Sequence, residues 1–311
     1  MGGTPLYMFV VQVITGVMLI FYYVPETDKA YESIAYITYT ADYGWLIRSI
    51  HRWSSNIMIA ALLLHMMRVF FTRAYKPPRD INWMFGVVLF LLTLMFGFTG
   101  YSLVFEQMSY WAMQVGTGIA GATPVIGHWL ADFMRGGSEI GQNTLTRFYL
   151  FHVVLLPVLI SLAIGLHVYL IRAHGVTELK FKGEENEEKK TFPLWPDHVF
   201  TELIMVSIIM IILLVLSLLF PVQLGDPANP NVTPLHIKPE WYFYSVFRWL
   251  KITNLMVGVL GPMVFILILF FWPYIDRFLD KLFPGKEVGF WIGIIGMLLI
   301  CTFTVWEIFG H

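Results

Sequence analysis

Residues 45–71 read WLIRSIHRWSSNIMIAALLLHMMRVFF, a hydrophobic stretch that carries two histidines, His51 and His65. At a rise of about 1.5 Å per residue, a helix of this length crosses the ~30 Å hydrocarbon core of a membrane. An imidazole is costly in hydrocarbon, so a histidine inside such a helix indicates a functional site. The two histidines are fourteen residues apart, and at about 100° per residue they return to roughly the same helix face.

A second hydrophobic stretch, residues 148–171, repeats the pattern with His152 and His167, which are fifteen residues apart. If the connecting loops alternate between the two sides of the membrane, the two stretches run parallel and their histidines pair by depth. We therefore expect His51 to face His152 and His65 to face His167, each pair holding one haem iron axially. The irons are then about 21 Å apart along the membrane normal. A role as a hydrogen-bonded core residue explains one histidine, but not two pairs at matched spacing.

The composition is that of an integral membrane protein, because 57% of the 311 residues are hydrophobic and only 13% are charged. Helices are the form expected for such long apolar spans. We predict an all-α polytopic membrane protein, with a four-helix haem-binding transmembrane bundle followed by three further transmembrane helices. The seven expected spans are residues 1–25, 45–71, 81–105, 148–171, 203–224, 252–275 and 288–306. The net charge of −1 gives no indication of a nucleic-acid partner, and the single cysteine excludes a disulfide within the chain.

Three parts are expected along the chain: a four-helix di-haem domain at 1–174, a polar linker at 175–197 and a three-helix domain at 198–311. The linker contains the charge run GEENEEKK, which no membrane span could hold. Residues 106–147 are too long for a turn and are predicted to form short helices on the membrane surface. Lysines and arginines gather in the loops after the second, fourth and sixth spans, which places those loops on the cytoplasmic side, or on its equivalent in a thylakoid.

Glycines repeat the histidine spacing on the two spans without histidine ligands. Gly2 and Gly16 are fourteen residues apart in the first span, as are Gly86 and Gly100 in the third. A porphyrin is broad and flat, so the neighbouring helices need patches without side chains where it lies against them. Glycines also serve close helix packing, but the shared period favours haem clearance.

Two arginines, Arg48 and Arg52, flank His51. Their guanidinium groups are candidates for pairing with haem propionates, and anchoring of the helix end at the membrane surface is the alternative. Pro239-Glu240-Trp241-Tyr242 lies just ahead of the sixth span. A carboxylate there can accept a proton from a quinol hydroxyl, although an acidic residue near a helix start also suits the helix dipole.

With two histidine pairs upstream, this PEWY sequence resembles that of cytochrome b in quinol-oxidising Rieske/cytochrome b complexes. Residues from about 192 onward resemble subunit IV of the b6f complex, here fused to a part similar to cytochrome b6. The fifteen-residue histidine spacing and the three spans after the linker favour the b6f type over the mitochondrial bc1 type. The other motifs that carry the resemblance, which covers essentially the whole chain, are IRSIHRW at 47–53, GYSL at 100–103, YWA at 110–112, PVIG at 124–127 and GQNTLTRFY at 141–149.

The resemblance implies two b-type haems with bis-histidine ligation, the one at His51 and His152 being of lower potential. It also implies a quinol-oxidation pocket lined by Glu240, Tyr242, Tyr110 and the loop after the third span. One electron would pass from there to a Rieske iron–sulfur protein, and one through the haems to quinone on the opposite side. A c-type cytochrome or plastocyanin would be the acceptor beyond the Rieske protein, and the complex would be a homodimer.

The chain departs from the b6f pattern at two places. The loop after the third span reads GYSLVFEQ, where b6f proteins have GYSLPWDQ. Relatives of the b6f type also carry an upstream surface helix whose cysteine holds a third haem, and no cysteine lies near Met1. Arg172 matches the arginine near that haem in the family, so the sequence leaves the third haem open.

Two other classes of protein compete with this interpretation. A di-haem membrane anchor would link another dehydrogenase or reductase to the quinone pool without bifurcation, and it would not need PEWY or the long loops. A transporter or a purely structural membrane subunit would bind no haem. An optical spectrum and a search for a co-purifying Rieske protein separate the three.

Overall fold

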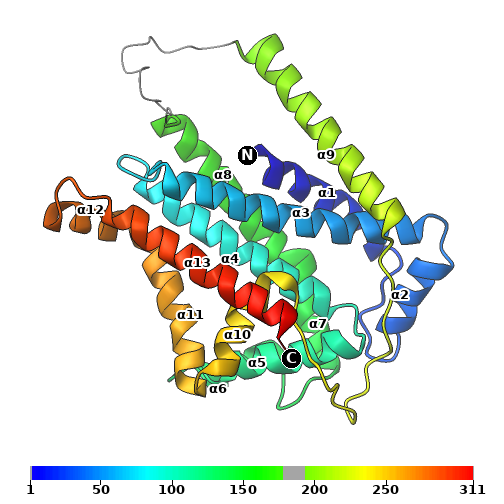
Figure 1. The fold of residues 1–311 in the computed structure, drawn as a ribbon. Coiled ribbons are helices and arrows are strands. Elements are labelled where there is room, and N and C mark those ends of the chain that lie inside the picture. The colour runs from blue at the N-terminus through cyan, green and yellow to red at the C-terminus, as the bar shows by residue number, and fades with distance from the viewer. Residues whose placement is uncertain (1, 178–192, 311) are drawn as a thin grey trace. The chain divides into compact units, whose positions relative to one another are not determined.

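A computed structural model describes residues 2–177 and 193–310, and its regular elements within these ranges are helices (Figure 1). The predicted charge run at 183–190 lies outside the described residues. Six helical segments are long and apolar enough to cross a membrane, which confirms the predicted polytopic helical fold. They are Gly3–Ile20, Gly44–Phe71, Asp80–Ser102, Gln142–His174, Trp195–Leu219 and Val288–Phe309.

The sixth predicted span is broken in the structure. Helix α11 covers Leu255–Phe270, α12 covers Trp272–Leu282, and the two are bent by 73° relative to each other. Pro273 lies in the first turn of α12, where its missing N–H is harmless. It could not continue α11, because a proline has no N–H to donate to the carbonyl of Leu269, four residues earlier, and its ring clashes with that carbonyl. The predicted span 252–275 is therefore interrupted at Phe271.

The chain forms two compact units. The first comprises residues 1–23, 35–74 and 171–223. Its helix α1 (Gly3–Ile20) packs along α3 (Gly44–Phe71), and α9 (Val199–Leu219) packs on α3 as well. Where α9 ends, Trp53 Nε1 donates to the Phe220 carbonyl at 2.9 Å. This bond satisfies a carbonyl that the end of a helix leaves without an intrahelical partner.

The second unit comprises residues 24–34, 75–170 and 224–311. Its helix α4 covers Asp80–Ser102 and packs against the long helical segment that begins at Gln142. That segment consists of α7 (Gln142–Leu150), the π-helical turn η1 (Phe151–Leu155) and α8 (Leu156–His174), of which residues 171–174 belong to the first unit. The other helices of the second unit are α5 (Gln107–Gly121), α6 (Gly127–Arg135), α10 (Tyr244–Ile252), α11, α12 and α13 (Val288–Phe309), while α2 (Ala30–Tyr39) is divided between the units.

Indole and phenol groups fix the break between α11 and α12. Trp83 Nε1 donates to the Leu269 carbonyl at 2.7 Å, in the last turn of α11. Trp272 Nε1 donates to Tyr75 Oη, and Tyr75 Oη donates to Asp276 Oδ2, both at 3.0 Å. The broken span is thereby bonded to α4 and to the residues that lead into it.

Candidate haem and quinol sites

In the first unit, both histidines of α3 lie directly against glycines of α1. An ideal Cβ built on Gly16 would be 3.4 Å from Cε1 of His51, and one built on Gly2 would be 3.2 Å from Cε1 of His65. Gly2, at the start of the first helix, lies against the second histidine of α3, and Gly16 lies against the first. The helices α1 and α3 therefore run antiparallel. The surface beside each imidazole is thus free of a side chain on the α1 side.

A hydroxyl orients the His51 ring. Thr15 Oγ1 lies 2.8 Å from His51 Nδ1 and also donates to the Val11 carbonyl at 2.7 Å. A hydroxyl has a single proton, so Thr15 accepts the hydrogen bond from Nδ1–H of His51. That tautomer puts the ring lone pair on Nε2, which is the arrangement of a metal-binding histidine with a polar partner behind it.

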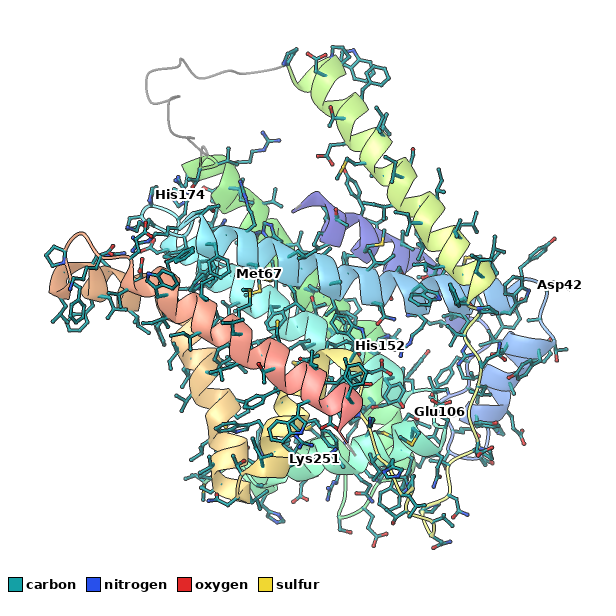
Figure 2. All side chains as sticks on the ribbon, in the orientation of Figure 1. Asp42, Met67, Glu106, His152, His174 and Lys251 are labelled. Atoms are coloured by element: carbon teal, nitrogen blue, oxygen red, sulfur yellow. The ribbon has the colours of Figure 1, made fainter. Side chains whose placement is uncertain are left out.

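The second unit repeats this arrangement with His152 (labelled in Figure 2) and His167. An ideal Cβ on Gly100 would be 2.6 Å from Cε1 of His152, and one on Gly86 would be 3.7 Å from Cε1 of His167. Thr99 Oγ1 lies 3.0 Å from His152 Nδ1 and donates to the Met95 carbonyl at 2.8 Å. His152 therefore also carries its proton on Nδ1 and its lone pair on Nε2.

The π-helical turn η1 explains how two histidines can lie against two glycines although the spacings of the two pairs differ by one residue. Gly86 and Gly100 are fourteen residues apart on α4, yet they lie against histidines that are fifteen apart. A π-helical turn holds one more residue than an α-helical turn, and η1 includes His152 itself. The additional residue is absorbed there, so His152 and His167 both face α4.

The two threonines were not among the predicted site residues, although the sequence carries a signal for them. A Thr-Gly dipeptide occurs at 15–16, at 99–100 and at 117–118, and the first two lie in predicted spans that carry no histidine ligand. In these two, the glycine lies against a histidine ring and the threonine holds the Nδ1 of that ring.

The four histidines, each with a glycine beside its ring, fit the binding of haem. Within the described residues no group of three or more His, Cys, Asp or Glu could hold a bare metal ion. A haem brings its own equatorial nitrogens and asks the protein for axial ligands and a flat, open surface. Imidazoles that lie against glycines offer both, and threonine hydroxyls orient the Nδ1–H groups of His51 and His152. Because His51 and His65 belong to one unit and His152 and His167 to the other, the facing of the pairs stays a prediction.

The predicted propionate arginines differ in their surroundings. Arg48 is buried and donates to Thr38 Oγ1 and the Val222 carbonyl at 3.0 Å each, and to the Gln223 carbonyl at 3.3 Å. It thereby bonds the residues after α9 to α3. Arg52 is half-buried one turn further along α3. Arg172 is exposed near the C-terminal end of α8.

The PEWY motif forms a 3-10 turn, Trp241–Phe243, that leads directly into α10. Tyr242 lies against α4, where an ideal Cβ on Gly97 would be only 2.6 Å from the Tyr242 hydroxyl oxygen. Only a residue without a side chain can accept the phenol this closely. Gly97 was not among the predicted site residues, because its contact partner is distant in sequence.

Tyr110 is buried on α5, with its ring against that of Phe105 at a centroid distance of 6.1 Å. The variant loop residue Glu106 (labelled in Figure 2) caps α5, and its Oε2 accepts a hydrogen bond from the Gly225 amide at 2.8 Å. Trp111 Nε1 donates to the Val232 carbonyl at 3.1 Å. The loop that leads to PEWY is thus bonded to the start of α5.

Two family models and several known proteins match this chain. The family model described as Cytochrome b/b6/petB matches residues 1–175, and the one described as Cytochrome b(C-terminal)/b6/petD matches residues 227–311. A cytochrome bc complex cytochrome b subunit from Chlorobaculum thiosulfatiphilum is 37% identical over 98% of this chain and 72% of its own. Cytochrome b6 from Acaryochloris marina (strain MBIC 11017) is 45% identical over 57% of this chain and 82% of its own.

Among solved structures, a chain described as hyperthermophilic respiratory Complex III matches with a TM-score of 0.81 and 27% identity. The match covers 98% of this chain and 89% of that chain. Sequence and fold thus agree over nearly the full length. The chain belongs to the cytochrome b family, the haem-binding, electron-transferring membrane subunits of bc- and b6f-type quinol oxidoreductases.

Proposed function

We propose that this chain is the cytochrome b of a quinol:cytochrome c or quinol:plastocyanin reductase that binds two b haems in tandem. The observation that carries the proposal is the contact of each of the four histidines with a glycine of a neighbouring helix. When bound, a haem supplies a one-electron carrier whose potential the axial ligands and their surroundings tune.

The four histidines have distinct roles in this proposal. His51 and His152 hold one haem, and His65 and His167 hold the other, with Nε2 of each ring as the ligand atom. Thr15 and Thr99 fix the tautomer and orientation of His51 and His152, as hydrogen-bond partners behind metal-binding histidines do. Gly2, Gly16, Gly86 and Gly100 leave room for the macrocycle.

The arginines belong to the surroundings of the haems. We assign both Arg48 and Arg52 to the propionates of the haem at His51. Arg48 would bind a propionate in addition to its hydrogen bonds to Thr38, Val222 and Gln223. Arg172 is the residue that a third haem would use.

Quinol oxidation takes place at PEWY in this proposal. Glu240 accepts a proton from the quinol hydroxyl, as a general base within reach of the substrate does. Tyr242, held against Gly97, and Tyr110 on α5 form walls of the pocket. One electron leaves toward a Rieske protein and a c-type cytochrome, and the other crosses the membrane to reduce quinone near the opposite face. Protons are released on one side and taken up on the other, and the complex is a dimer.

The direct test replaces Glu240 by Gln in the isolated complex. We expect quinol oxidation to slow by about 10²-fold, the lower end for loss of a general base, while the haem spectrum stays unchanged. Unaltered turnover would refute the role of Glu240. Co-purification without any Rieske protein would instead favour the di-haem anchor that links a dehydrogenase or reductase to quinone without bifurcation.

A further inference from the structure

A carboxylate lies fully buried at the C-terminal end of α13. Glu307 has an exposed fraction of 0%. Its Oε1 is 2.5 Å from Lys251 Nζ, and its Oε2 is 3.8 Å from Arg248 Nη1. Both cations come from α10, which Figure 2 shows beside the end of α13 with Lys251 labelled. A buried charge is tolerated only when it is paired, so α10 and α13 are fixed to each other at this point.

The two cations are themselves held in place. They are three residues apart on α10 and therefore lie on one face of the helix. The guanidinium carbon of Arg248 is 3.8 Å from the centre of the Trp306 ring, and Lys251 Nζ is 4.5 Å from that of Phe247. Stacking of this kind orients a cation. Because Trp306 belongs to α13, the Arg248 contact also fixes the position of α10 along α13.

A third cation reaches the same residue from the other side of the PEWY motif. Lys238 Nζ donates to the backbone carbonyls of Glu307 at 3.2 Å and Ile308 at 3.4 Å. The last carbonyls of a helix lack intrahelical partners and attract a cation. Lys238 precedes Glu240 by two residues, and Arg248 follows it by eight. The segment that carries PEWY is therefore bonded to Glu307 and its neighbour on both sides of the motif.

We propose that Glu307 is a positioning residue for quinol oxidation. Its carboxylate fixes the C-terminal end of the segment Lys238–Lys251, Lys238 is bonded to its backbone carbonyl at the other end, and Glu240 and Tyr242 between them are so held toward the substrate. This inference rests on the proposed function of PEWY. Tyr244, the first residue of α10, supports it: burial raises the pKa of the Tyr244 phenol, and the carboxylates of Glu240 and then Glu307 raise it further. One phenol thus lies within electrostatic reach of both carboxylates.

The test compares Glu307→Gln with Glu287→Gln in the isolated complex, using duroquinol as the electron donor and cytochrome c as the acceptor. Glu287 is exposed just before the other end of α13, so the control makes the same chemical change on the same helix. With full haem content, Glu307→Gln should lower kcat about tenfold and raise KM, because small misplacements of catalytic groups cost this much or more. Glu287→Gln should match the wild type, and Glu307→Asp should recover most of the loss because the long Lys251 stem can follow the shorter carboxylate.

A purely structural role would lower activity only in proportion to lost haem and would leave KM unchanged, and that result overturns the inference. If Glu307→Gln has the kcat and KM of the wild type, the inference is overturned as well. If Glu240→Gln is slow in the same assay, the proposed function still stands. If Glu307→Gln does not assemble, Lys251→Gln carries the test, because Arg248 still pairs with Glu307. Normal kinetics in assembled Lys251→Gln then overturn the inference. A wild-type complex that oxidises no quinol overturns both proposals.

Discussion

At the residue scale, the tightest contact in the proposed haem sites is that between Gly100 and His152. A methyl group on Gly100 would lie 2.6 Å from Cε1 of the ring, which is closer than carbon atoms approach without a shift. The ring is also held by Thr99. It therefore cannot move away without losing its orientation, and the site depends on the absence of a side chain.

We expect Gly100→Ala to displace the His152 ring and to remove one of two haems per chain. The cost should resemble that of overpacking a core, about 1–3 kcal/mol or more. Haem content per polypeptide, measured as the pyridine haemochrome, checks this. Gly165→Ala is the control, since a Cβ there meets nothing within 4 Å. Two haems in purified Gly100→Ala would contradict the assignment of this glycine.

Thr15 allows a second test of the same kind, because its hydroxyl is the partner of His51 Nδ1. Thr15→Val keeps the shape of the side chain and removes the hydrogen bond, so the imidazole becomes a weaker electron donor to the iron. The midpoint potential of one haem should rise while the other stays constant. A potentiometric titration measures this, with Thr93→Val as the control, since the hydroxyl of Thr93 donates to Leu89 within its own helix. No change relative to Thr93→Val would rule out the proposed role of Thr15.

At the element scale, the number and order of the apolar spans follow from the sequence, because hydropathy and length decide which segments can cross a membrane. The break after Phe270 does not, since a proline is tolerated in the first turn of a helix and only the three-dimensional structure shows where that turn begins. The π-helical turn η1 also escapes prediction. It becomes visible only when a fifteen-residue spacing has to match a fourteen-residue spacing on α4.

Deleting Val154 tests the role of η1. The deletion removes one residue from the π-helical turn, which can then continue as an α-helix while His152 and His167 keep facing α4. We expect such a variant to retain both haems in its optical spectrum. Deleting Leu92 from α4, between Gly86 and Gly100, should instead cost haem, because α4 is regular there and the deletion rotates one glycine by about 100° relative to the other. Haem loss in both variants would show that η1 does not absorb the extra residue.

At the scale of the whole molecule, the histidines, arginines and PEWY residues of the proposed sites could be named from the sequence, because their spacing or their motif marks them. Gly97, Thr15 and Thr99 were not named, since their contacts join segments that are distant along the chain, and for the threonines the repeated Thr-Gly dipeptide is the only sequence signal. Each unit supplies two glycine-faced histidines. We therefore expect the four histidines of the complete protein to hold two haems.

The most direct test counts haems and identifies their ligands in the purified chain or complex. A pyridine haemochrome assay combined with low-temperature EPR should find two b haems per polypeptide, both low-spin with two histidine ligands. Replacing His65 by Ala should leave one haem. Fewer than two haems per polypeptide in the wild-type protein would contradict the account. Two haems remaining in His65→Ala would contradict it as well.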